Sequence, residues 1–253
     1  MPASLKELDK ALKMLLKPEQ FRDYCPNGLQ VEGKQKVYKI ISGVTASMAL
    51  IEAAIEERAD FIFVHHGYFW KGENPAITGV KKARLQALIQ NNISLCAYHL
   101  PLDAHPKLGN NAQLAQVLGF VKQSILDDDE NHPIIFLGKL TTPMSFDDLS
   151  LHIESKLNRK PLAIQGKSST IKRIAWCSGG AQGLIGHAVD AQVDAYVTGE
   201  VSEQTVHIAR ETGLHFFSAG HHATERYGVQ AVGSYLSNNF DISHKYLDID
   251  NPA

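Results

Sequence analysis

Two pairs of adjacent histidines follow apolar segments that have the composition of β-strands. The first pair is His65 and His66, and the second pair is His221 and His222. Adjacent side chains leaving a strand can point to different sides, so His65 and His66 could serve two metal ions, or both could reach one ion through the following turn. Imidazole is the commonest metal ligand in proteins. Two such pairs therefore favour a metal site.

Carboxylates accompany these histidines. Glu225 lies four residues after His221 at the start of a predicted helix, which places both on one face about 6 Å apart, a spacing that metal-binding helices use. Asp103 follows His99 by four residues across a proline-containing turn, and Glu200 follows another apolar run. Because open α/β sheets bind ligands beyond the carboxyl ends of their strands, we expect these side chains to serve one kind of site.

The candidate ligands form a nitrogen and oxygen set that selects Zn, Mn, Fe, Ni or Co over thiophilic ions. Five ligands exceed the three that a catalytic mononuclear zinc keeps, which favours a two-metal site. Two metals have an advantage over one because they can stabilise both the entering and the leaving oxygen of a hydrolysis. The candidate metal ligands are His65, His66, Asp103, His221 and Glu225.

Glu200 and His207 are the candidate catalytic residues. Glu200 could act as a general base or hold a metal ligand in place, and His207, about two helical turns later, could hydrogen-bond a ligand or the substrate. His99 and His222 could contact the ligands or the substrate. A single imidazole is usually only a polar residue entering solvent. That interpretation is given to His105, His132, His152, His187, His215 and His244.

Two further segments each allow two interpretations. The small-residue turn 177–183 could present backbone N–H groups to an anion, or its glycines could allow a helix to pack closely on the sheet. The aromatic run 68–70 could stack on a flat substrate, although packing in the core or an interface is the commoner role of large aromatic residues. No Ser-His-Asp or Cys-His arrangement can be assembled from local motifs.

Composition excludes several classes of protein. The 253 residues include 25 Lys+Arg and 27 Asp+Glu, a net charge of −2 that gives no electrostatic case for a dedicated nucleic-acid or membrane-surface binder. The three cysteines form no C-x-x-C pair, which argues against a disulfide framework or a thiolate zinc site. No apolar run reaches the roughly 18 residues of a membrane span. We therefore expect a cytoplasmic protein without a membrane partner.

Short apolar runs alternate with amphipathic segments of helical period, which predicts an α/β fold whose helices cover the sheets. The strands are predicted at 38–43, 61–65, 93–98, 134–140, 172–177, 194–198, 214–218 and 244–249. The helices are predicted at 4–16, 47–58, 81–91, 111–118, 145–157, 182–191, 202–212 and 222–238.

A self-comparison predicts an internal repeat. A shift of 134 positions aligns 41–66 with 175–200, with four identical residues and the same order of strand, small-residue turn, helix and strand. In this alignment Glu200 falls on His66. We therefore expect two α/β halves, 1–126 and 127–253, joined by an acidic linker at 127–130.

Several motifs together resemble those of the GTP cyclohydrolase 1 type 2 homologue family, also called Nif-three-like proteins, in its compact bacterial form. The resemblance covers essentially the whole chain, and the combination of both histidine pairs with LPLDAH is specific. The motifs are NGLQVEG (27–33), GVTAS (43–47), FVHHGYFWKGE (63–73), YHLPLDAH (98–105), NNAQLA (110–115), CSGGAQ (177–182), TGEVSEQ (198–204) and AGHHATER (219–226).

The resemblance implies two intertwined, pseudo-symmetric α/β halves with helices layered on mixed sheets. It also implies a dinuclear centre of two divalent metal ions per subunit, such as Zn, Mn, Fe, Ni or Mg, held by the five candidate ligands, with Glu225 as the bridging carboxylate. Family members are similar in forming toroidal homohexamers, trimers of dimers. The implied activity is hydrolysis of a nucleotide or purine-type substrate, by ring opening or at a phosphoester. The alternative is a non-catalytic, metal-bound ring-shaped scaffold or regulatory binding protein.

Overall fold

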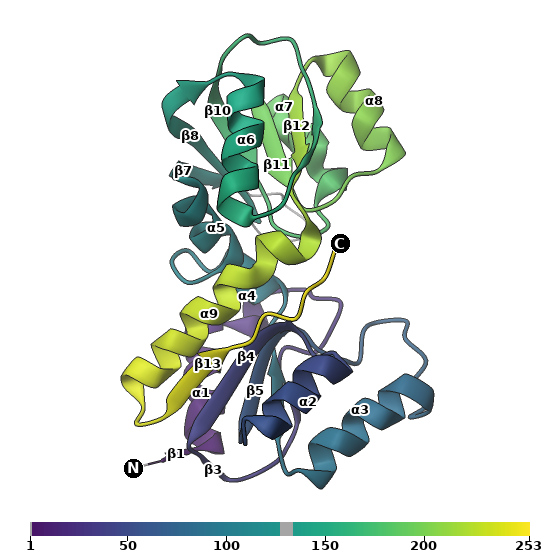
Figure 1. The fold of residues 1–253 in the computed structure, drawn as a ribbon, viewed down its shortest axis with the longest axis vertical. Coiled ribbons are helices and arrows are strands. Elements are labelled where there is room, and N and C mark those ends of the chain that lie inside the picture. Colours follow the sequence, from purple (N-terminus) through teal and green to yellow (C-terminus); the bar gives the residue numbers. More distant parts are fainter. Residues whose placement is uncertain (1, 127–133) are drawn as a thin grey trace. The chain divides into compact units, whose positions relative to one another are not determined.

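The computed structural model describes residues 2–126 and 134–253, and the chain divides into two compact units (Figure 1). Unit 1 comprises residues 1–109 and 228–250, and unit 2 comprises 110–227 and 251–253. Both units have helices layered on mixed sheets, as predicted. The acidic linker at 127–130 and His132 lie outside the described residues.

Unit 1 contains a five-stranded sheet in the order β13-β4-β5-β6-β2. Its strands are β2 (Gly28–Val31), β4 (Lys39–Thr45), β5 (Phe61–His66), β6 (Ser94–Ala97) and β13 (Ser243–Tyr246), and β1 (Ala3–Ser4) pairs separately with β3 (Lys36–Val37). Its helical segments are α1 (Leu5–Leu16), η1 (Pro18–Gln20), α2 (Met48–Glu56), α3 (Gly79–Gln90), α4 (Leu100–Ala104) and the later turns of α9 (His221–Asn239).

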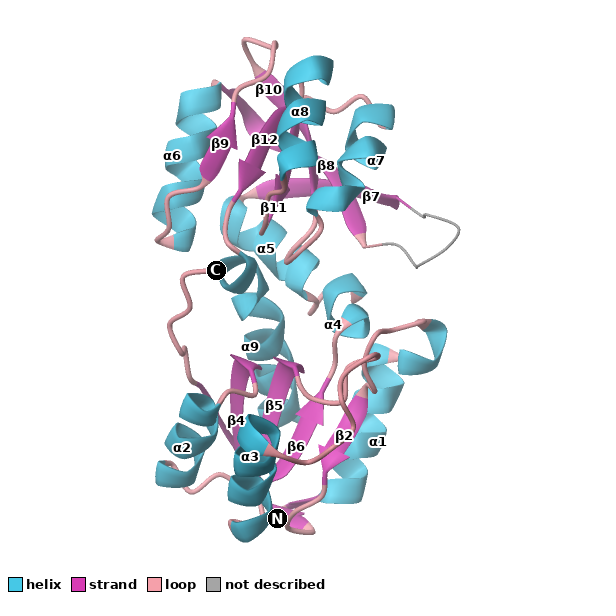
Figure 2. Ribbon diagram, turned by 90° about the vertical axis from the view of Figure 1, so that its right-hand side faces the viewer, coloured by secondary structure: helices cyan, strands magenta, loops and turns pink. Residues whose placement is uncertain are grey.

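Helices cover both faces of this sheet because successive residues of its strands alternate between two cores (Figures 1 and 2). Phe61 and Phe63 pack with leucines of α1 and with Val232 of α9. Ile62 and Val64 pack on the opposite face with residues of α2 and α3. Burial on both faces explains why β5 is an almost continuous apolar run.

Unit 2 contains a six-stranded sheet in the order β7-β8-β10-β11-β12-β9. The strands are β7 (Phe120–Leu126), β8 (Ile135–Met144), β9 (Leu162–Ile164), β10 (Ile171–Trp176), β11 (Ala195–Thr198) and β12 (His215–Ser218). One face is covered by α5 (Asn110–Leu118) and α6 (Phe146–Leu157), and the other by η2 (Gln182–Leu184), α7 (Ile185–Asp190) and α8 (Glu203–Thr212).

Serine hydroxyls fix the starts of four helices. Ser4, Ser47, Ser145 and Ser202 each accept a hydrogen bond from the backbone N–H three residues later, at the starts of α1, α2, α6 and α8. Such caps satisfy N–H groups that have no partner within the helix. They place these helix starts within two residues of the predicted positions.

The two units repeat the same strand pairings at a constant offset. Ile40 of β4 lies opposite Phe61 of β5, and Ile174 of β10 lies opposite Ala195 of β11, both 134 residues further along. In each sheet, an antiparallel edge strand lies beside the last of the parallel strands. This edge strand is β2 beside β6 in unit 1 and β9 beside β12 in unit 2. These pairings have the offset of the predicted repeat, and the repeat itself and the halves at 1–126 and 127–253 stay predictions.

The sequence analysis missed five strands and two short helical segments, and it misplaced some ends. The missed elements are β1, β2, β3, β7, β9, η1 and α4, and of these β2, β7 and β9 are short or exposed strands at sheet edges. Edge strands have one unpaired side and weaker apolar patterning, so their sequences resemble loops. The predicted helix 182–191 begins as η2, and the predicted strand 244–249 ends at Tyr246.

Candidate metal centre

In unit 1, His65 has the geometry of a metal-ligating imidazole. It occupies the carboxyl end of the central strand β5 and is fully buried. Its Nδ1 lies 2.9 Å from the backbone carbonyl oxygen of Tyr98. A carbonyl oxygen only accepts, so Nδ1 carries the proton, and the neutral ring presents the lone pair of Nε2. This is how metal-binding histidines are usually oriented.

Asp103 supplies a carboxylate to this Nε2. Its Oδ1 lies 3.5 Å from His65 Nε2, and its side chain is nearly buried. Two ligand atoms bound tetrahedrally at about 2.1 Å from one cation lie roughly 3.4 Å apart. The separation therefore fits two ligands of one ion better than it fits a strong hydrogen bond. The short helix α4 holds Asp103 there, since the backbone N–H of Asp103 donates to the carbonyl oxygen of His99.

His66 and His99 complete a cluster of three imidazoles with His65. Their ligand nitrogens lie within 4.8 Å of one another. The His66 and His65 ring centroids are 4.5 Å apart, and the His99 and His65 centroids are 5.1 Å apart. His66 Nδ1 lies 3.2 Å from the hydroxyl oxygen of Thr45 on the neighbouring strand β4. The cluster could hold a metal through nitrogen alone.

Asp23, which the sequence analysis did not select, fixes the ring of His99. Its Oδ1 lies 2.7 Å from His99 Nδ1, and its oxygens also accept from the Asn27 amide and the Leu100 N–H. Burial alone would raise the pKa of Asp23, but its bonds to His99, Asn27 and the Tyr24 N–H lower it below the usual value. The only sequence signal is that Asp23 precedes the motif NGLQVEG, because its contact with His99 spans 76 positions.

Cys25 lies beside this pair and forms a second possible ligand group with Asp23 and His99. Burial, followed by the charge of Asp23, raises the pKa of the Cys25 thiol to about 12. A metal ligand or nucleophile would have to be the thiolate. Cys25 therefore fits this environment as a buried thiol, and all three cysteines are buried and outside any disulfide.

In unit 2, His221 lies between two carboxylates. Its Nδ1 is 2.7 Å from Glu200 Oε1, and its Nε2 is 3.1 Å from Glu225 Oε2. Burial would lower the pKa of His221, but hydrogen bonds and charges of Glu225 and Glu200 raise it to about 9. Glu200 follows β11, and α9 places His221 and Glu225 one turn apart, as the four-residue spacing predicted. The arrangement is a carboxylate–histidine pair with a second, nearly buried carboxylate at Nε2.

A family model described as Duf34/NIF3 (NGG1p interacting factor 3) matches residues 3–252. The chain belongs to this family. It is 54% identical, over the full length of both chains, to a Pseudomonas aeruginosa protein named GTP cyclohydrolase 1 type 2 homolog, and 50% identical over 248 residues, 98% of each chain, to the Escherichia coli K12 protein of that name.

Solved structures of similar chains have the same fold. A protein described as ybgI, of unknown function, is 49% identical with a TM-score of 0.95, covering 99% of this chain and 100% of that one. A Thermus thermophilus protein is 34% identical with a TM-score of 0.89 over the same shares. The resemblance to the NIF3 family inferred from motifs is thus confirmed.

The glycine-rich turn of this NIF3 family member packs against the candidate ligands of unit 2. The N–H of Gly179 donates to the hydroxyl of Thr224, and that of Ser178 donates to the Asn111 side chain. A Cβ at Gly179 would lie 2.1 Å from Glu225 Oε1. These N–H groups are thus used within the fold, which favours the close-packing interpretation of 177–183 over anion binding.

The remaining predicted residues lie in different settings. His207 is exposed on α8 and belongs to none of the possible metal-ligand groups among the described residues. His222 is half-buried, and its N–H donates to the carbonyl oxygen of Ala253. Of the aromatic run, Tyr68 is buried, whereas the Trp70 ring lies edge-on to His99 at 5.0 Å.

No helix among residues 2–126 and 134–253 combines the length and the apolar character needed to cross a membrane.

Proposed function

We propose that this NIF3 family protein binds two divalent metal ions per subunit and is a metal-dependent hydrolase of a nucleotide or purine-type substrate. The proposed ligands are His65, His66, Asp103, His221 and Glu225. The observation that carries the proposal occurs in both units. An imidazole has its Nδ1 held by an oxygen acceptor, and a nearly buried carboxylate lies 3.1–3.5 Å from its Nε2.

The donor set fits hard or borderline divalent ions. It contains imidazole nitrogens and carboxylate oxygens, and the nearby Cys25 thiol stays protonated because burial raises its pKa. Such a set accepts Zn, Mn, Fe, Ni or Mg, so the identity of the metal depends on availability as well as affinity. Asp103 and Glu225 are buried carboxylates, and a bound divalent cation would offset the desolvation cost of their charges.

When bound, a pair of divalent cations lowers the pKa of water and stabilises the oxygens of a hydrolytic displacement. The protein's own contribution is positional. The Tyr98 carbonyl and the Glu200 carboxylate hold the proton on Nδ1 of His65 and His221, so a cation would bind at Nε2, and in His221 it would replace the Nε2 proton that the raised pKa favours. We propose Glu200 as a positioning residue for His221, and His207 as a residue that contacts substrate from α8.

The name shared by the bacterial relatives, GTP cyclohydrolase 1 type 2 homolog, supports a purine nucleotide as the first substrate to test. The experiment incubates purified protein with GTP and a nucleotide panel in the presence of Mn, Zn, Fe, Ni or Mg. We expect turnover that Glu225→Gln abolishes together with bound metal. Glu211→Gln, on the exposed side of α8, is the matched control and should keep both.

Two outcomes would contradict parts of this proposal. Metal binding at full occupancy with no turnover of any substrate would favour the alternative, a metal-bound scaffold or regulatory protein. Full metal content in Glu225→Gln would instead show that the ligand assignment is wrong. Measuring metal per chain and product formation on the same samples separates the two results.

We further propose that the chain assembles into a homohexamer, a trimer of dimers, as its resemblance to toroidal family members implies. Light scattering on the purified protein tests this directly. The expected mass is six times the 27.9 kDa of one chain. A monomer at micromolar concentration would contradict the proposed assembly without affecting the ligand assignment.

A further inference from the structure

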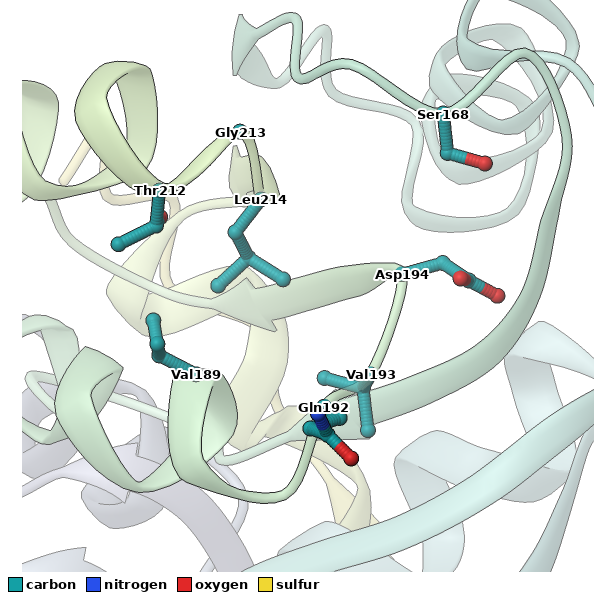
Figure 3. A pocket seen from close by; sticks show the side chains of 8 residues that line it. All are labelled: Ser168, Val189, Gln192, Val193, Asp194, Thr212, Gly213 and Leu214. Carbon is teal, nitrogen blue, oxygen red and sulfur yellow. The ribbon is translucent and has the colours of Figure 1, made fainter.

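A pocket of about 260 Å³ opens in unit 2 at the end of the sheet where β11 begins, whereas Glu200 follows the other end of that strand. Figure 3 shows Ser168 and Asp194 on one side and Val189 and Leu214 on the other. The pocket thus combines apolar side chains with one carboxylate. Its volume is somewhat below that of pockets for drug-sized ligands, so it suits a smaller molecule.

The two oxygens of the Asp194 carboxylate differ in their hydrogen bonds. Its Oδ2 accepts from the backbone N–H groups of Lys172 and Arg173, at 2.8 and 2.7 Å. No hydrogen bond or ion pair from the residues that the structure describes reaches its Oδ1. The guanidinium of Arg173 points elsewhere, because it donates to the carbonyl oxygen of Ala191.

Unit 1 contains the same arrangement with an ammonium group in place. Asp60 lies 134 positions before Asp194, and its Oδ2 accepts from the N–H groups of Tyr38 and Lys39. Its Oδ1, however, is paired with the ammonium of Lys34 at 2.7 Å. The two units therefore present the same carboxylate geometry, and unit 1 shows which chemical group that geometry holds.

Lys167 is the unit 2 counterpart of Lys34, and it is directed away from Asp194. The N–H of Lys34 donates to the carbonyl oxygen of Asn92, and that of Lys167 donates to the carbonyl oxygen of Gly213, so Gly213 corresponds to Asn92. A Cβ at Gly213 would lie 2.6 Å from Lys167 Cδ. The lysine stem thus occupies space that a side chain would fill.

Among residues 2–126 and 134–253, the ammonium of Lys167 makes one long contact. Its Nζ lies 3.4 Å from the carbonyl oxygen of Glu211, near the end of α8. The carbonyl end of a helix is favourable for cations. The carboxyl end of α8 thus already has the Lys167 ammonium, and the Asp194 carboxylate, beside an apolar wall, is the feature of the pocket that attracts a further positive charge.

We propose that this pocket binds a small primary alkylammonium ion of about the length of a lysine side chain. Its nitrogen pairs with Oδ1 of Asp194, as the Lys34 ammonium pairs with Asp60. Its carbon chain lies against Val189, Val193 and Leu214. This site is separate from the proposed metal ligands and does not depend on the proposed hydrolase activity.

The test is a titration of the full-length protein with n-butylammonium chloride, followed by calorimetry and by methyl NMR signals of Val189, Val193 and Leu214. We expect saturable binding that moves these signals. Asp194→Asn keeps an oxygen for the two backbone N–H groups but removes the charge, and should weaken binding at least about tenfold, which corresponds to about 1.4 kcal/mol. Asp60→Asn, the same change in unit 1, should leave the affinity unchanged.

A second variant tests the comparison between the units. Gly213→Asn introduces the residue found at position 92, and asparagine tolerates the positive φ of +80° at this position. We expect the displaced Lys167 to turn towards Asp194 and abolish butylammonium binding in the folded protein.

Three results would overturn the proposal. They are absence of saturable binding to the wild-type protein, equal affinity of Asp194→Asn, and equal affinity of 1-butanol, which has the same length but no charge. The last result would mean that the pocket takes any short apolar chain.

Discussion

At the scale of single residues, each of two candidate metal-binding imidazoles has an oxygen acceptor at its Nδ1. Glu200 holds Nδ1 of His221, and the Tyr98 carbonyl holds Nδ1 of His65. Because the carbonyl is backbone, no side-chain substitution removes it directly. Glu200 is therefore the position where the role of this contact can be measured.

We expect Glu200→Ala to lower metal affinity by about 10–100-fold, as loss of a partner behind a ligating histidine generally does. The His221 ring would lose the acceptor that fixes its tautomer. Glu200→Gln keeps an oxygen acceptor and should retain most of the affinity. Calorimetric metal titrations check the order of the three proteins, and equal affinities would show that Glu200 does not position His221.

Gly179 offers a second test at this scale. An added Cβ would lie 2.1 Å from Glu225 Oε1 and 3.2 Å from His221 Nε2, and the backbone has a φ of +67°. We expect Gly179→Ala to displace Glu225 and to reduce bound metal, with a further strain of about 1 kcal/mol. Metal analysis and thermal unfolding measure the two effects.

Gly183→Ala is the matched control for that change, because nothing lies within 4 Å of its Cβ position. It should bind as much metal as the unchanged protein. Unaltered metal content in Gly179→Ala would contradict the close packing of this turn on Glu225.

At the scale of elements, ion pairs join α2 to the neighbouring strands of unit 1. Glu57, which follows α2, accepts from the ammonium groups of Lys39 on β4 and Lys245 on β13. These two hydrogen bonds, Lys245 first, lower the pKa of Glu57 from 4.5 to about 2. The folded state thus favours the ionised carboxylate.

The lowered pKa predicts a pH dependence of stability. The contribution of Glu57 is fully present above its ordinary pKa of 4.5, and it is lost as the pH falls from there through about 2. Glu57→Gln should therefore be less stable than the wild type at pH 7, and the difference should disappear towards pH 2. Urea unfolding at several pH values measures it.

The control on the same helix is Glu56→Gln, whose side chain is exposed. It should leave stability unchanged at every pH. A difference between Glu57→Gln and the wild type that persists at pH 2 would show that packing, and not the charge of Glu57, stabilises these strands.

At the scale of the whole molecule, the proposed metal binding predicts a coupling between ligand and folding. A metal that binds only the folded chain stabilises it by about 4 kcal/mol at a concentration 1,000 times the dissociation constant. We expect chelation to lower the melting temperature and added metal to restore it. In Glu225→Gln the melting temperature should respond much less to chelator, and an equal response would place the stabilising metal elsewhere.

The amino-acid sequence by itself determined the element types and the candidate ligands. Apolar strand patterns and helical periods depend on residues close together in the chain, so eight strands and eight helices were predicted near their observed positions. The histidine pairs stand out for the same reason, since strand ends are local features. The His221 and Glu225 pair needed only the four-residue repeat of a helix.

Only the tertiary structure decided which distant groups meet. Asp23 reaches His99 across 76 positions, and Gly179 packs on Glu225, contacts that no local pattern contains. The two aspartates that lie 134 positions apart also differ for this reason. Asp60 pairs with Lys34, whereas no lysine in the described part of the chain pairs with Asp194. Such differences arise from backbone paths and side-chain packing between elements, and these depend on the whole fold.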